Sequence, residues 1–64
     1  MYNIHTETPS GAVSRGYDYE TEEKALTMFT RVEAQLEAMG FVGDLILTEG
    51  GVVTRRESIS NVHV

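Results

Sequence analysis

Residues 21–41 have the sequence TEEKALTMFTRVEAQLEAMGF, and this stretch decides the fold. Thr21 is a suitable N-cap, and the two glutamates after it suit the positive end of a helix dipole. Gly40 can adopt the left-handed conformation that ends a helix, which lets Phe41 fold back onto the last turn. The stretch therefore predicts a helix that begins after Thr21 and ends at Met39.

One face of this predicted helix is apolar. Its apolar residues recur at spacings of three and four, which is the pattern of a helix with one side against a core. The stripe consists of Ala25, Phe29, Val32, Leu36 and Met39, and Met28 widens it. We therefore expect the helix to cover one face of a sheet.

The residues before the helix predict a β-hairpin. Residues 1–6 alternate between two faces as a half-buried strand does, and the sequence Thr-Pro-Ser-Gly at 8–11 has the chemistry of a turn. Closing the hairpin across this turn pairs Thr6 with Val13, Ile4 with Arg15 and Tyr2 with Tyr17. Arg15 would then share a face with apolar residues, which is tolerable at the edge of a sheet.

The residues after the helix predict a second hairpin. Strands at 45–48 and about 52–58 are joined by Glu-Gly-Gly at 49–51. An even-length connection places Ile46 and Val53 together on one face, and Leu45 and Leu47 on the other. Both faces of this hairpin are thus apolar, whereas the first hairpin has a polar outer face.

The element order predicts an α+β fold, ββαββ, in which a four-stranded antiparallel sheet carries the helix on one face. Residues 1–59 are expected to form a single small domain. Residues 60–64 form a C-terminal tail that extends the last strand, forms a short fifth strand or frays. In this arrangement Ile46 and Val53 are expected to be exposed in a monomer.

Composition narrows the classes of function. The 64 residues include 5 Lys+Arg and 10 Asp+Glu, for a formal charge of −5, and no Cys. This balance argues against a nucleic-acid-binding surface, which needs clustered basic residues. Because the chain contains no apolar run of membrane-spanning length and no signal-peptide pattern at its start, no membrane contact is expected. A secreted protein of this size would more often carry disulfides, so the lack of cysteine favours a cytoplasmic location.

No pattern of catalytic or metal-binding residues stands out, so the chain is expected not to be an enzyme and to need no cofactor. The serines lack a nucleophile-elbow pattern, and Gly50-Gly51 joins two strands instead of preceding a helix as a phosphate loop does. His5 and His63 lie near opposite ends of the chain. They could share a metal or a pH-sensing role only if the last strand paired with the first.

The function favoured by the sequence is protein binding, first to a second copy of the same chain. A chain of this length builds a small core, and without cysteines a partner subunit is the leading means of support. The expected homodimer interface consists of Ile46, Val53 and Arg55, through packed outer faces or through pairing of the last strand. Two alternatives are an inhibitor of a host protein, of phage or plasmid type, and a binder of a small ligand between helix and sheet, near Tyr17, Tyr19, Phe29 and Phe41.

Overall fold

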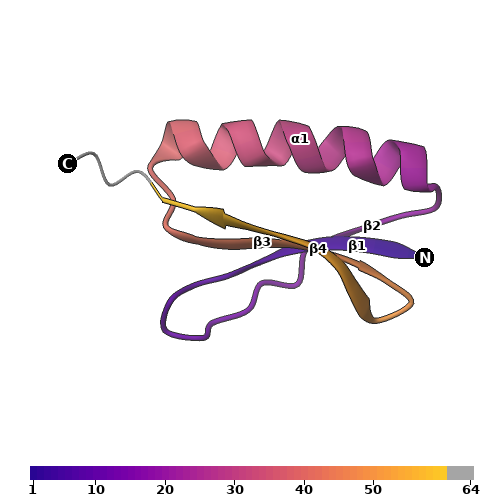
Figure 1. The fold of residues 1–64 in the computed structure, drawn as a ribbon, viewed down its shortest axis with the longest axis horizontal. Helices are drawn as coiled ribbons and strands as arrows, with labels where there is room; N and C mark the ends of the chain where they lie inside the picture. The colour runs from indigo at the N-terminus through magenta and orange to yellow at the C-terminus, as the bar shows by residue number, and fades with distance from the viewer. Residues whose placement is uncertain (61–64) are drawn as a thin grey trace.

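The structure, a computed structural model, describes residues 1–60. Its elements are β1 (Tyr2–Glu7), β2 (Tyr17–Tyr19), α1 (Glu22–Met39), β3 (Gly43–Glu49) and β4 (Val52–Ile59). The strands form one antiparallel sheet in the order β2-β1-β3-β4, and α1 lies along one face of it (Figure 1). The predicted ββαββ fold is confirmed. The expectations for residues 61–64, which include His63, concern a segment outside the described residues.

The helix begins and ends at the residues that the sequence predicted. The Thr21 side chain accepts a hydrogen bond from the backbone N–H of Lys24 at 3.3 Å, which satisfies one of the free donors of the first turn. Gly40 has a φ of 78°, and the N–H groups of Gly40 and Phe41 donate to carbonyls of the last turn at 3.2 and 3.0 Å. These two bonds form a Schellman motif, which turns the chain from α1 into β3.

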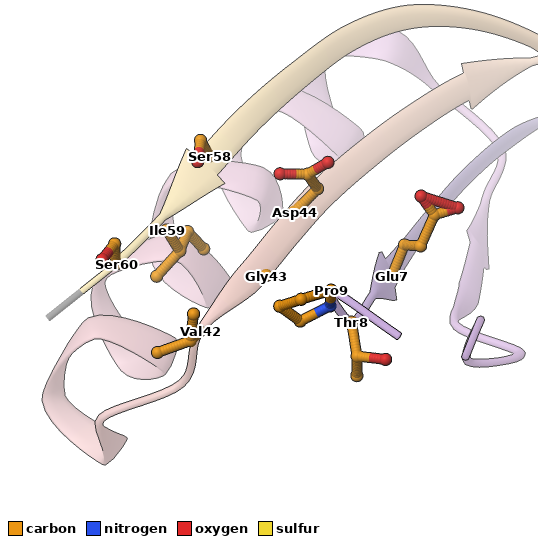
Figure 2. Close-up of a pocket in the computed structure, with 9 residues that line it drawn as sticks. All are labelled: Glu7, Thr8, Pro9, Val42, Gly43, Asp44, Ser58, Ile59 and Ser60. Atoms are coloured by element: carbon orange, nitrogen blue, oxygen red, sulfur yellow. The ribbon is translucent and has the colours of Figure 1, made fainter. Parts of the chain in front are cut away.

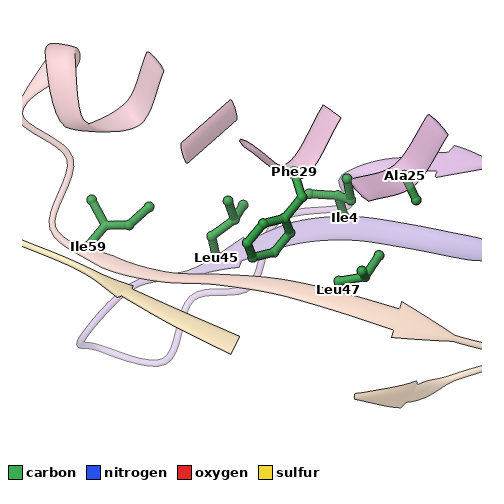
Figure 3. Close-up of a cluster of buried hydrophobic side chains, with 6 residues drawn as sticks. All are labelled: Ile4, Ala25, Phe29, Leu45, Leu47 and Ile59. Carbon is green, nitrogen blue, oxygen red and sulfur yellow. The ribbon is translucent and has the colours of Figure 1, made fainter. Parts of the chain in front are cut away.

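The core lies between α1 and the sheet, where Phe29 points from the helix toward the strands (Figure 3). The buried cluster consists of Ile4, Ala25, Phe29, Leu45, Leu47 and Ile59. Met39 was predicted to join this core but is 75% exposed. The prediction failed because the chain reverses at Gly40, and Phe41 packs against the core there instead.

The first hairpin has the predicted turn but a different register. The N–H of Gly11 donates to the carbonyl of Thr8 at 2.9 Å, which closes the expected turn. The strands pair Ile4 with Tyr17 and Tyr2 with Tyr19, so the predicted partners are wrong by two residues. Val13 already bridges Glu7 instead of Thr6, and the irregular segment at 14–16 adds the second residue of the difference before β2 begins.

The second hairpin has a two-residue turn and a bulge. Glu49 pairs with Val52 across Gly50-Gly51, and Val53 shares the outer face with Ile46 near the turn, as predicted. The register then shifts between Leu47 and Thr48, so an extra residue of β4 is accommodated at this point. Beyond the bulge, Arg55 pairs with Leu47 and lies on the helix side of the sheet, whereas Arg56 pairs with Ile46 on the outer side.

Candidate interaction surface

β4 is the long open edge of the sheet. It has eight residues and, within residues 1–60, pairs on one side only, with β3. All of its side chains are exposed except those of Glu57 and Ile59. An edge strand presents unpaired backbone N–H and C=O groups, so it can accept a further strand from another chain.

The opposite edge of the sheet offers much less. β2 has three residues, and the adjoining part of β1 is covered by the loop that precedes β2. Ser14 makes two hydrogen bonds to Thr6 there. Its backbone N–H donates to the carbonyl of Thr6 at 2.9 Å, and its hydroxyl accepts a hydrogen bond from the N–H of Thr6 at 2.8 Å. These bonds occupy the backbone groups of β1 where β2 no longer reaches. Of the two edge strands, β4 is therefore the one that presents a long row of unpaired backbone N–H and C=O groups.

Ile46 is not exposed, contrary to the expectation from the sequence. Its side chain is on the outer face, yet only 3% of the residue is accessible to solvent. Its direct neighbours across the strands are His5 on β1 and Arg56 on β4, whose long side chains flank it. Ile46 therefore offers almost no surface to a partner.

The side chain of Arg56 is held over the outer face by two carboxylates. Its guanidinium lies 3.2 Å from Glu7 Oε1 and 3.4 Å from Asp44 Oδ2. Glu7 and Asp44 face each other across β1 and β3, and like charges in that position repel. Arg56 thus neutralises an acidic pair and joins three strands beside Ile46.

We expect Arg56→Gln to lower the free energy of unfolding by about 0.5–1 kcal/mol, because these partly exposed ion pairs are screened by water. The loss should shrink as salt is added, since salt screens the remaining repulsion between Glu7 and Asp44. Urea unfolding of both proteins over a series of NaCl concentrations measures this. Arg31→Gln, on the exposed side of α1, is the matched control and should change little. A difference between wild type and R56Q that is absent at low salt would contradict the role given to Arg56.

Val53 remains exposed on the outer face, as the sequence predicted, with 55% of its surface accessible. It lies beside the Gly50-Gly51 turn, and its neighbour Val52 is exposed on the other side of the same hairpin tip. Without Ile46 beside it, Val53 offers a single apolar side chain. The broad apolar outer face expected from the sequence is therefore absent at this hairpin.

Arg55, the third residue of the expected interface, lies on the helix side of β4. Its guanidinium carbon is 4.8 Å from the centre of the Phe29 ring, a cation–π contact. Its Nε atom is 3.6 Å from a carboxylate oxygen of Glu57, two residues along the same strand. Arg55 and Glu57 therefore form a neutral pair of opposite charges along the open edge.

The rest of the outer face is a polar network centred on Asn3. The Asn3 amide donates to the Asp18 carboxylate at 2.9 Å, and its oxygen lies 2.8 Å from Nδ1 of His5. This arrangement makes the Asn3 oxygen the acceptor, so Nδ1 of His5 carries the proton. β1 is flanked by β2 and β3, so β4 does not bring a second histidine to His5 by pairing with its strand.

A groove of about 430 Å³ opens where β3 begins and β4 ends (Figure 2). Its walls include Pro9, Val42 and Ile59, together with the carboxylates of Glu7 and Asp44. Both carboxylates already form ion pairs with Arg56, so neither of them is left unpaired in the groove. Among residues 1–60 no three His, Cys, Asp or Glu side chains are grouped to hold a metal ion.

A shallow site at the other end of the sheet combines Tyr2, Glu22, Glu49 and Arg55. A hydrogen bond to the Glu49 carboxylate raises the pKa of Tyr2, and desolvation and the charges of Glu49 and Glu22 raise it further. The phenol therefore stays protonated at physiological pH and serves as a donor to Glu49. This contact joins the start of β1 to the end of β3.

The four aromatic residues proposed to surround a small ligand do not enclose a common cavity. Phe29 is completely buried, and Tyr19 and Phe41 pack against the core. Tyr17 is exposed at the β2 edge. Three of the four therefore serve the core, and the geometry gives the ligand-binding alternative no site at these residues.

Comparisons of the chain with protein-family models, with curated proteins and with solved structures found no match. No helix within residues 1–60 is long and apolar enough to cross a membrane. The surfaces of the chain itself are therefore the guide to its function.

Proposed function

We propose that this chain is a small, non-enzymatic protein-binding module that acts as a homodimer joined through β4. The observation that supports this proposal is the open edge of β4, which is eight residues long and has mostly exposed side chains. Pairing with a second β4 would satisfy its free backbone groups and extend the sheet across both copies.

The charges on β4 do not oppose this pairing. Charged side chains commonly protect an edge strand from association. Here, however, Arg56 is neutralised by Glu7 and Asp44, and Arg55 by Glu57. The edge therefore carries its own compensating charges, even though the whole chain has a formal charge of −5.

Packing of two outer faces, the other mode considered from the sequence, has less support. Ile46 is buried, and Arg56 and its two carboxylates would have to lose water at such an interface. Desolvating charged groups is costly unless new partners replace the water. The edge of β4 gains main-chain hydrogen bonds without burying this cluster.

We expect light scattering to give a mass of twice the 7.1 kDa chain over a range of protein concentrations. Amide hydrogen exchange should slow in β4 as the concentration rises, because backbone groups at the edge become bonded in the dimer. Val53→Asp should leave this mass unchanged, since the Val53 side chain points to the outer face and the edge pairs through its backbone. A monomer at every concentration would contradict the proposed function. A dimer that V53D abolishes would favour outer-face packing instead.

A further inference from the structure

The geometry points to one register for this dimer: an antiparallel β4–β4 pairing centred on Arg56, with Arg55 of each copy opposite Glu57 of the other. This inference rests on the proposed function, because it specifies how the same edge recognises a second copy. The partner at the edge is a second β4 that runs in the opposite direction, so the order of its charges along the edge is reversed.

The faces of β4 make this pairing possible. Arg55 and Glu57 pair with Leu47 and Leu45 of β3, both of which are core residues. The two charged side chains therefore point to the helix side of the sheet, and they are about equally exposed, at 44% and 41%. In an antiparallel pair, residues directly opposite each other point to the same face, so Arg55 can meet Glu57 of a second copy.

Two-fold symmetry then repeats the contact. When Arg56 lies on the symmetry axis, Arg55 of the first copy faces Glu57 of the second, and Glu57 of the first faces Arg55 of the second. The two sheets become one, with both helices on the same side.

The neighbouring registers are less favourable. A dimer centred on Arg55 would place two arginines opposite each other, and one centred on Glu57 would place two glutamates opposite each other. Like charges in that position are destabilising. The chosen register places Arg56 opposite Arg56, but each of these guanidinium groups lies against Glu7 and Asp44 of its own copy. The acidic pair offsets the repulsion at the centre.

Disulfide trapping tests the register directly, because the chain contains no cysteine. Arg55→Cys and Glu57→Cys are oxidised separately and as an equimolar mixture, and the products are separated without reducing agent. We expect covalent dimers in the mixture and almost none with either variant alone. Rapid cross-linking of R55C alone or of E57C alone would overturn the register, as would a mixture that stays uncross-linked while light scattering shows a dimer.

Charge reversal provides a second test without cysteine chemistry. Arg55→Glu and Glu57→Arg each place like charges opposite one another, so each should raise the dimer dissociation constant about tenfold. Mixing the two variants restores both opposite-charge contacts, and a heterodimer should form. Lys24→Glu, on the exposed side of α1, is the matched control and should dimerise normally.

Circular dichroism first confirms that each variant is folded. If loss of the Phe29 contact unfolds R55E, E57R, which leaves that contact in place, tests the pairing through its own dissociation constant. Mixing that restores no association would overturn the pairing of Arg55 with Glu57. A wild-type chain that is monomeric would instead overturn the proposed function itself, so the two failures are distinguishable.

Discussion

Phe29→Ala is expected to remove a large part of the protein's free energy of unfolding. Phe29 is completely buried at the centre of the cluster between α1 and the sheet (Figure 3), and such truncations cost about 3–5 kcal/mol. A domain of this length has a total stability of about 3–10 kcal/mol, by the usual range per residue. The substitution also removes the ring beneath Arg55. Thermal and urea unfolding followed by circular dichroism measure the loss.

Two variants make this result interpretable. Met39→Ala removes an apolar side chain from the same helix at an exposed position, so it should melt within a few degrees of the wild type. Phe29→Leu keeps much of the buried volume and should fold with a smaller loss. If Phe29→Ala costs no more than Met39→Ala, the helix does not pack on the sheet as described.

Gly16→Ala is expected to cost about 2–5 kcal/mol, because the new methyl group has no room and the backbone has a positive φ. Gly16 has a φ of 72°. A Cβ atom there would overlap the carbonyl oxygen of Ile4 and lie 2.7 Å from Cβ of His5. Both obstacles belong to β1, an interior strand that cannot move without disturbing its pairing with β3. Urea unfolding gives the loss.

Gly11→Ala is the matched control for this prediction. Gly11 also has a positive φ, 91°, but no atom lies within 4 Å of the position that a new methyl group would take. It should therefore show only the backbone cost, about 1–2 kcal/mol. Equal losses for the two variants would mean that the close approach between the segment at 14–16 and β1 is unimportant.

The elements that the sequence predicts well are those fixed by local chemistry. The helix ends at Met39 because Gly40 supplies a left-handed residue, and it begins after Thr21 because that side chain caps the first turn. Strand alternation also places Arg55 and Arg56 on opposite faces of β4, as the structure shows. Each of these features depends on a few consecutive residues.

The features that the sequence does not reveal depend on residues far apart in the chain. The register of the first hairpin depends on how the hydroxyl of Ser14 replaces a ladder bond to Thr6. The burial of Ile46 accompanies an ion cluster assembled from β1, β3 and β4, whose members are separated by up to 49 residues. No local pattern indicates that Arg56 will lie across this face, so the candidate interface was only partly predictable.

The order β2-β1-β3-β4 also has a consequence for synthesis on the ribosome. β1 is synthesised before the helix, whereas β3, its partner in the interior of the sheet, follows the helix in the sequence (Figure 1). A nascent chain that stops at Gly40 contains β1, its short partner β2 and α1, but it lacks β3 and β4, which complete the sheet on which the helix packs. The sheet can close only after the last third of the chain has emerged, so folding is a late event and truncated products have no stable core.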